Sequence, residues 1–161
     1  MARPTWNNIP DADLDLDSPG KTQDVFEYLR DNAGAVRIAI LGIYMGEETD
    51  NSASYVEHTD TITLHIPDVA DYTGIQRKVS VTVEVKVSAG TGTFQLKDDA
   101  TSTTGGEVTS TSTGYEDKTL TLDLDASWKG TDRTIIVQYK VSGGNDCYVK
   151  AGPRYDTWLE Y

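Results

Sequence analysis

A run of alternating valines in the middle of the chain constrains the fold more than any other feature. Within residues 77–88, every second position from 79 to 87 is valine, and the residues between are polar or charged. Successive side chains of a β-strand point to opposite faces, so this period of two predicts a strand with one buried and one solvated face. Such strands are typical of antiparallel sheets, which commonly pack only one face on the core.

Shorter segments with strand patterns lie on both sides of this run. Apolar and polar residues alternate in 61–66, 93–97, 119–125, 133–142 and 147–151, and the last segment, 154–161, is rich in aromatic residues. Glycine-containing turns separate several of these segments, and the polar stretch 101–114 is either a weak strand or an exposed loop. About seven or eight short strands with no helix between them predict an all-β fold, an antiparallel β-sandwich, with a jelly roll as the most specific assignment.

One short amphipathic helix is predicted ahead of the strands, over residues 18–32. Ser18 can cap its N-terminus, Pro19 suits the first helical position, and Gly34 follows as a stop signal. Residues 35–44 are predicted to form a buried strand or, alternatively, a continuation of the helix broken at Gly34.

These segments suggest a simple domain organisation. The polar residues 46–59 are expected to form a loop that joins the N-terminal part to the body. We therefore expect an N-terminal region, 1–50, made of an arm, the helix and a connecting strand, followed by a β-sandwich domain, 51–161. A chain of 161 residues fits one domain with a short appendage.

The arm before the helix carries large apolar residues that stand alone among proline, asparagine and aspartate. Residues 1–16 show no sustained helical or strand period, so the arm is not expected to pack on itself. Apolar residues spaced in this way pack either on the sandwich of their own chain or on a neighbouring subunit. We expect docking and assembly to depend on Trp6, Ile9, Leu14, Leu16, Phe26 and Leu29. Phe26 and Leu29 are expected to act by anchoring the helix.

Composition argues against several classes of partner. The 26 acidic and 14 basic residues give a formal net charge of -12, which repels phosphate backbones and anionic lipids, so neither nucleic acid nor a membrane is expected. The longest apolar run, residues 38–45, is far shorter than the ~20 residues of a membrane span, and no signal peptide is expected. The single cysteine, Cys147, excludes an internal disulfide, and with only two histidines the sequence argues against a zinc site.

The acidic run at the start of the helix has two interpretations. As a calcium-binding loop, its ligands would be Asp13, Asp15, Asp17 and Asp24. However, Ser18 stands where such a loop requires glycine, and Pro19 stands where a backbone carbonyl ligand is needed. Carboxylates near a helix N-terminus are also stabilised by the helix dipole and can cap the helix. We therefore expect no metal and no cofactor.

No catalytic constellation is recognisable. His65 is expected on the surface and His58 in a loop, without a carboxylate at a spacing that would orient either ring, and Cys147 is expected to face the core. No serine lies in a nucleophile-elbow pattern, and no glycine-rich phosphate loop precedes a helix. We therefore expect that the protein is not an enzyme.

Aromatic residues near the C-terminus are the one feature of the body that could carry recognition. Exposed rings can stack on sugars or form the hot spots of a protein interface. Alternatively, half of these rings fill the core, as Tyr139 is expected to do from its inward register. The residues proposed to stack on a ligand are Trp128, Tyr148, Tyr155 and Trp158.

The N-terminal segment resembles a segment of one known group of proteins. It runs Trp6-x-x-Ile9, Asp11-Ala12-Asp13-Leu14-Asp15, Asp17-Ser18-Pro19 and a helix that ends Leu29-Arg30-Asp31-Asn32. This order is similar to a segment found in tail and head-associated structural proteins of tailed bacteriophages and prophages. The resemblance covers residues 1–32 and departs afterwards, where Ala33-Gly34 replaces the usual Asn-Pro. The body is similar only in outline to the jelly-roll domains of phage decoration proteins, fibres and carbohydrate-binding modules.

The resemblance implies a non-enzymatic structural protein located in the virion. It would be a capsid cement or head-spike protein, or a tail fibre or adaptor component, docked through its arm on capsid or tail and neck subunits. The resemblance also implies a symmetric homo-oligomer, with a trimer favoured by analogy. The alternative is a carbohydrate-binding sandwich that recognises host surface glycans.

Overall fold

The fold is known from a computed structural model that describes residues 37–39, 43–66, 78–128, 130–154 and 158–160. One compact unit spans Ile38–Glu160. The predicted arm, helix and acidic run, and with them all six docking residues, lie outside the described residues.

The described residues form ten strands, and the one helix among them is a short 3-10 turn, η3 (Ala126–Trp128). The strands are β1 (Arg37–Ala39), β2 (Ile43–Asp50), β3 (Val56–Ile66), β4 (Lys78–Val87), β5 (Gly92–Asp98), β6 (Val108–Ser110), β7 (Glu116–Asp123), β8 (Thr131–Val141), β9 (Cys147–Arg154) and β10 (Trp158–Glu160). No described helix is long and apolar enough to cross a membrane.

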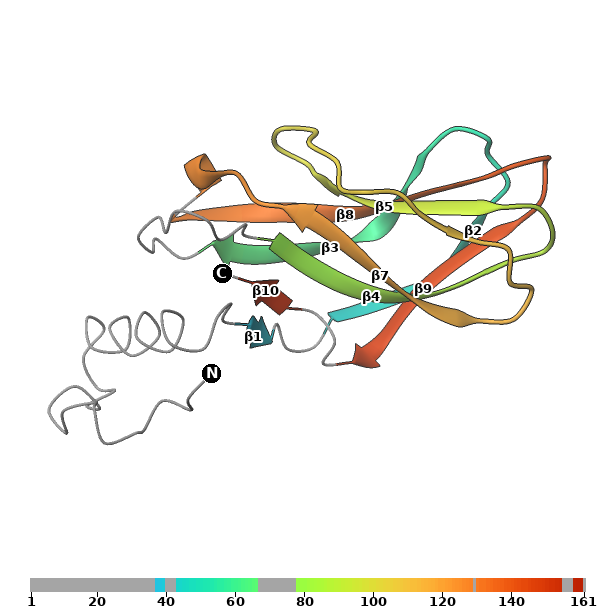
Figure 1. The fold of residues 1–161 in the computed structure, drawn as a ribbon, viewed down its shortest axis with the longest axis horizontal. Helices are drawn as coiled ribbons and strands as arrows, with labels where there is room; N and C mark the ends of the chain where they lie inside the picture. Colours follow the sequence, from blue (N-terminus) through green and yellow to red (C-terminus); the bar gives the residue numbers. More distant parts are fainter. Residues whose placement is uncertain (1–36, 40–42, 67–77, 129, 155–157, 161) are drawn as a thin grey trace, which may run out of the picture. The chain divides into compact units, whose positions relative to one another are not determined.

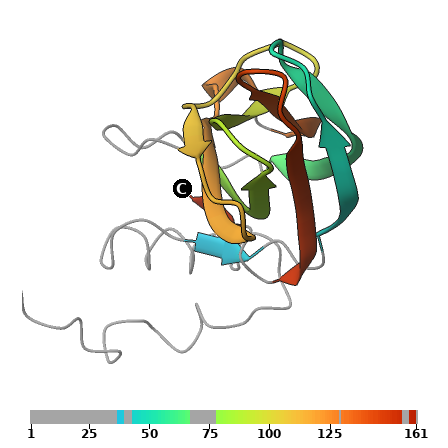
Figure 2. The ribbon, with the colours of Figure 1, turned by 90° about the vertical axis from the view of Figure 1, so that its right-hand side faces the viewer.

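Strands β2 to β9 form two packed layers (Figures 1 and 2). In one sheet the neighbours are β2, β9, β4 and β7, and in the other they are β3, β8, β5 and β6. Between β2 and β9 the chain therefore changes sheet at every connection except the β5–β6 hairpin, which is the strand order of a jelly roll. Strand β10 extends the first sheet by pairing with the start of β4. Strand β9 pairs with the end of β4. The predicted antiparallel β-sandwich is confirmed, and its strand order is that of the predicted jelly roll.

The core lies between the two inner faces, where the predicted alternation holds. All five valines of β4 are at most 1% exposed, and they face apolar residues of the opposite sheet such as Phe94 and Leu96. Burying each aliphatic side chain of this kind stabilises the fold by about 1.5–3 kcal/mol. The inward positions predicted near the C-terminus are also confirmed for Tyr139, Cys147, Val149 and Ala151.

The predicted loop over 46–59 is wrong at both ends, because residues 46–50 belong to β2 and residues 56–59 belong to β3. Residues 43–50 form β2, which pairs with β9 and so belongs to the sandwich. Only Met45 among the described side chains of β2 is buried, while Tyr44, predicted within a buried strand, is 71% exposed. An edge strand that contributes one side chain to the core leaves little apolar signal in the sequence.

His58 also differs from its predicted place in a loop, because it lies in β3 and is 2% exposed. Its Nε2 donates to the carbonyl of Gly46 at 3.0 Å, and its Nδ1 accepts from the amide of Asp60 at 3.0 Å. The Asp60 carboxylate in turn accepts from the amide of Gly46 at 2.7 Å. These bonds occur where β3 shifts register against β8, between Glu57 and Thr61. They connect β3 to β2 and so close one corner between the sheets.

The stretch 101–114 contains both of its predicted alternatives, a loop and the short strand β6. The loop folds back along β5, where the amide of Gly105 donates to the carbonyl of Leu96 at 2.8 Å. Gly105 also lies against β7, because a Cβ atom built on it would be 1.9 Å from the carbonyl oxygen of Thr121. This loop therefore covers part of the outer edge of β7.

Cys147 provides a built-in probe of global unfolding. Its side chain is fully buried, and burial raises the pKa of the thiol to about 12. Only a thiolate reacts rapidly with disulfide reagents, so at about pH 8 the folded protein should label at least ~1,000-fold more slowly than the unfolded chain. Labelling with a chromogenic disulfide reagent across a urea series checks this. Rapid labelling without denaturant would show instead that β9 opens locally.

Candidate functional site

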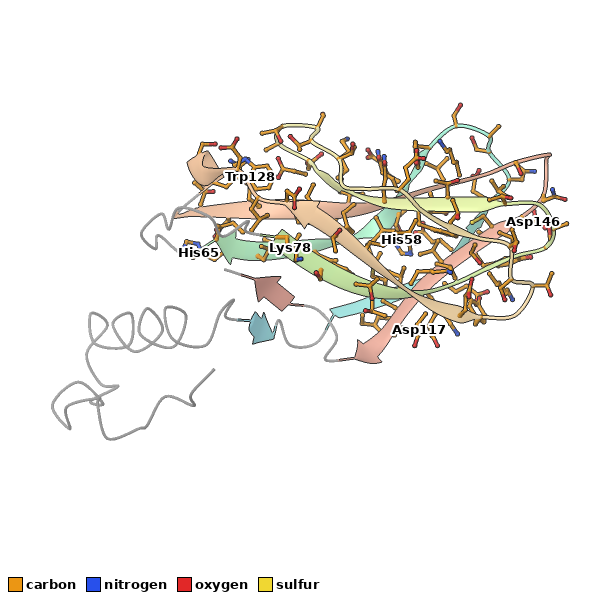
Figure 3. All side chains as sticks on the ribbon, in the orientation of Figure 1. His58, His65, Lys78, Asp117, Trp128 and Asp146 are labelled. Atoms are coloured by element: carbon orange, nitrogen blue, oxygen red, sulfur yellow. The ribbon has the colours of Figure 1, made fainter. Side chains whose placement is uncertain are left out.

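The most distinctive surface of the described residues is a cluster of tyrosine and lysine side chains outside the first sheet. We call Lys86, Tyr115, Tyr148 and Lys150 the tyrosine–lysine cluster. Lys86 of β4 lies opposite Tyr148 of β9 in the sheet register, and Tyr115 immediately precedes β7. Figure 3 labels Asp117, two residues further along the chain at the start of β7.

The lysines of this cluster lie against the rings. The Nζ of Lys86 is 4.4 Å from the ring centroid of Tyr115 and 4.3 Å from that of Tyr148. The Nζ of Lys150 is 4.0 Å from the Tyr115 centroid and 3.6 Å from Oε2 of Glu84. The Tyr115 hydroxyl donates to Glu47 of β2, and its pKa is raised by burial and then by this bond. The cluster therefore links four neighbouring strands and is internally paired.

Among the predicted stacking residues with described side chains, Tyr148 is the one that belongs to this cluster. One of its ring faces meets the ammonium of Lys86, so that face is not open to a sugar. Its stacking role remains a prediction. Sequence reasoning did not select Tyr115, Lys86 or Lys150, although the alternation of β4 places Lys86 on the solvated face. The missing information was the register between strands far apart in the sequence.

A similar arrangement lies on the second sheet. The Tyr55 hydroxyl donates to Glu107, and the Nζ of Lys140 is 3.3 Å from Oε1 of Glu107 and 4.1 Å from the Tyr55 ring centroid. The pKa of Glu107 is lowered, first by the bond from Tyr55 and then by Lys140, and the pKa of Tyr55 is raised, mainly by burial. These contacts connect the loops before β3 and before β6 to β8.

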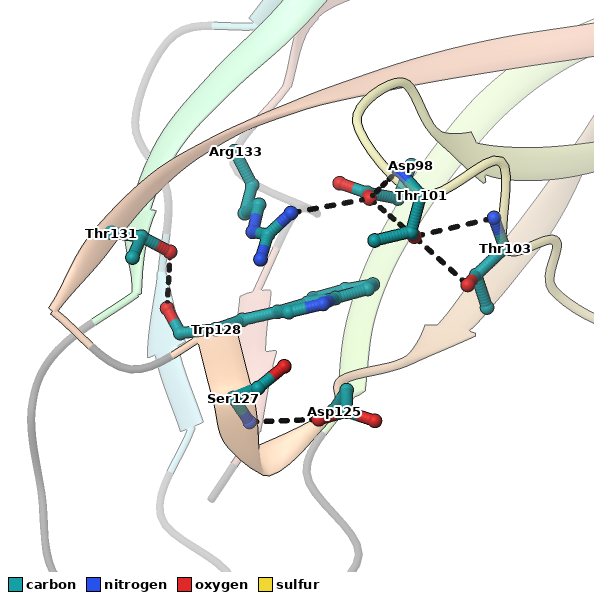
Figure 4. Close-up of polar contacts among 8 residues, drawn as sticks. All are labelled: Asp98, Thr101, Thr103, Asp125, Ser127, Trp128, Thr131 and Arg133. Carbon is teal, nitrogen blue, oxygen red and sulfur yellow. Dashed lines mark hydrogen bonds and ion pairs between the residues drawn. The ribbon is translucent and has the colours of Figure 1, made fainter.

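Trp128 is not an exposed stacking residue, and this predicted role is wrong. Its side chain is 1% exposed, and the guanidinium carbon of Arg133 lies 4.7 Å from the ring centroid (Figure 4). Arg133 also lies 3.5 Å from Oδ2 of Asp98, a fully buried carboxylate. The same Oδ2 accepts from the amide and the hydroxyl of Thr101, at 2.8 and 2.6 Å. Because the ring is enclosed, no ligand can stack on it.

Two of the predicted stacking residues, Tyr155 and Trp158, have no described side chain. Tyr155 lies outside the described residues, as do the carboxylates of the weak metal alternative. Trp158 lies in β10, where its backbone pairs opposite Ser80, and its side chain is not described. His65 is exposed as predicted, and its Nδ1 is 2.7 Å from Oδ1 of Asp132. Within the described ranges, no group of three or more His, Cys, Asp or Glu side chains is placed to hold a metal ion.

Comparison with known proteins gives only distant structural likenesses. No protein-family model matches the chain, and no curated protein sequence matches it. The similar solved structures include chains of infectious bursal disease virus. One, from the T13 viral particle, has a TM-score of 0.37 and 10% identity over 78% of this chain and 35% of its own. Another, from the Gt strain, has a TM-score of 0.33 and 9% identity over 80% of this chain and 40% of its own.

Proposed function

We propose that this protein is a non-enzymatic structural protein of a tailed-bacteriophage virion. It would be a capsid decoration protein, either cement or head spike, or a tail fibre or adaptor component. The observation that carries the proposal is the jelly-roll strand order of β2 to β9, an architecture used by viral capsid and lectin domains. The resemblance of residues 1–32 to phage tail and head-associated proteins supplies the kind of virus.

In this proposal the two parts of the chain have different tasks. The jelly roll supplies a rigid body, whose corner between β2 and β3 is closed by the bonds of His58 and Asp60 to Gly46. The N-terminal arm docks on capsid or tail and neck subunits, or on a sister subunit of a symmetric oligomer such as a trimer. The net charge of -12 supports protein partners over nucleic acid.

Removing residues 1–16 is expected to abolish incorporation into particles while leaving the sandwich folded. The sandwich should persist because its compact unit begins only at Ile38. The measurement is the amount of the protein in purified particles, with circular dichroism of the free protein as the folding check. Incorporation equal to that of the full chain would contradict the docking role of the arm.

A pair of point variants sharpens this test. Trp6→Ala removes the largest arm residue and should lower incorporation by about tenfold or more, as expected for a hot-spot aromatic residue. Tyr44→Ala removes an aromatic side chain that is 71% exposed on the sandwich and should leave incorporation unchanged. Equal effects of the two variants would show that the arm has no special role.

The second candidate function is recognition of host surface glycans. It is favoured by the position of Tyr148, half-buried on the outer face of the first sheet beside Tyr115. A glycan array with the full chain, followed by Tyr148→Ala and Trp158→Ala, tests it. Absence of binding on the array, or binding that neither substitution changes, would remove ring stacking at these residues.

A further inference from the structure

A shallow pocket of about 330 Å³ lies at one end of the second sheet, and its lining includes Lys140, which also contacts the Tyr55 ring. Its lining residues include Ala53, Thr91, Thr93, Lys140, Ser142 and Gly143. Thr93 and Lys140 are directly opposite each other in the register of β5 and β8. The pocket is at the end of the sandwich where Figure 3 labels Asp146, in the turn that follows Gly143. Its volume is at the lower end of the range of about 300–1,000 Å³ for small-ligand sites.

Thr93 is the feature that points to a ligand. The residue is only 9% exposed, and its hydroxyl forms no hydrogen bond with any described residue. Among the described side chains, the completely buried polar atoms without a partner are Asp98 Oδ1 and Arg133 Nε. The Thr93 hydroxyl is not one of them, so it retains access to solvent through the pocket it lines. A nearly buried hydroxyl without a protein partner needs a hydrogen bond from water or a ligand.

The neighbouring groups favour a ligand with several hydroxyls. The Thr91 hydroxyl also has no partner among the described residues, while Ser142 Oγ accepts only the amide of Thr91, at 3.1 Å. Hydroxyl groups both donate and accept, so they match the hydroxyls of a sugar in either direction. Methyl groups of the threonines and Ala53 provide apolar contact for the C–H face of a sugar ring.

The local charge favours a neutral ligand over an anion. Lys140 is the one cation of the lining, and it is already paired with Glu107 at 3.3 Å. The whole chain carries a net charge of -12, which disfavours the approach of a carboxylate or phosphate.

We propose that this pocket binds one neutral sugar residue of a glycan, through the hydroxyls of Thr91, Thr93 and Ser142. The site is separate from Tyr148 and Trp158 and does not depend on the virion role of the protein. A pocket this open holds only one ring, so the affinity for a free monosaccharide is expected to be about millimolar.

The test is an NMR titration of the isotopically labelled full chain with D-glucose, D-galactose and N-acetyl-D-glucosamine, each to about 50 mM, well above a millimolar dissociation constant. At least one sugar should give saturable amide shifts centred on Thr91, Thr93, Ser142 and Gly143. N-acetylneuraminic acid, which carries a carboxylate, should bind at least tenfold more weakly. Absence of saturation with all three neutral sugars, tighter binding of the acid, or shifts centred on Tyr148 would each overturn the proposal.

Three variants assign the binding to the pocket. Thr93→Val removes the hydroxyl while keeping the branched shape, and should weaken binding about tenfold, the effect of one lost hydrogen bond. Thr63→Val makes the same change at an exposed position on β3 of the same sheet and should leave binding unchanged. Ala53→Phe places a large ring in an exposed loop and should block the pocket without changing a strand. This variant keeps the test valid if Thr93→Val folds poorly. Unchanged binding in Ala53→Phe, or in a folded Thr93→Val, would overturn the assignment.

Discussion

Replacing Gly105 with alanine should cost the protein about 3 kcal/mol or more of its free energy of unfolding, a large fraction of the 5–15 kcal/mol of a typical domain. The added Cβ would be 1.9 Å from the carbonyl oxygen of Thr121 and 3.0 Å from its carbonyl carbon. These atoms belong to the backbone, so no side-chain rotation relieves the contact. Thr121 is fixed in β7 by its pairing opposite Ser80 of β4. The loop would have to move away from β7 and lose the bond from the Gly105 amide to Leu96.

The adjacent glycine provides the matched control. A Cβ on Gly106 would have no atom within 4 Å, so Gly106→Ala should change stability by no more than about 0.5 kcal/mol. Chemical denaturation of both variants, followed by circular dichroism and by the reactivity of Cys147, checks the prediction. Equal midpoints for the two variants would mean that the loop does not lie tightly on β7.

The parts of the fold that could be predicted are those with a strong local period. The valines of β4 define their own inner face, and Cys147 and Val149 define that of β9. Strand β2 carries no such period, because Met45 is the only one of its described side chains that is buried in the core. Its position depends on pairing with β9, about a hundred residues later in the chain, which no local pattern reveals.

The candidate sites were less predictable for the same reason. The tyrosine–lysine cluster joins residues of β4, β9 and the segment before β7, and each residue alone is an ordinary surface position. Trp128 is predicted as a ligand-stacking residue because it falls in a turn region between two strands. In the structure its ring lies against Arg133. Arg133 in turn contacts Asp98, which lies 35 residues earlier in the chain than Arg133. Only the folded chain brings these residues together.

Trp128→Ala should therefore destabilise the protein by about 3–5 kcal/mol, the usual effect of removing a buried aromatic side chain. The substitution leaves a cavity where a ring that is 1% exposed had been, and it removes the surface on which the guanidinium of Arg133 lies. That guanidinium would then keep only its contact of 3.5 Å with Asp98. For a chain of this length, the loss corresponds to a fall in melting temperature of about 10 °C or more.

A ligand-stacking role predicts the opposite result, namely unchanged stability and loss of glycan binding. Thermal unfolding should be followed by circular dichroism, because the substitution removes one of the three tryptophans that would report by fluorescence. Tyr44→Ala is the matched control, since it removes an aromatic side chain that is 71% exposed and should change the melting temperature by no more than about 2 °C. If Trp128→Ala behaved like Tyr44→Ala, the ring could not be part of the core. A large shift in Trp128→Ala alone would establish that this ring is part of the core.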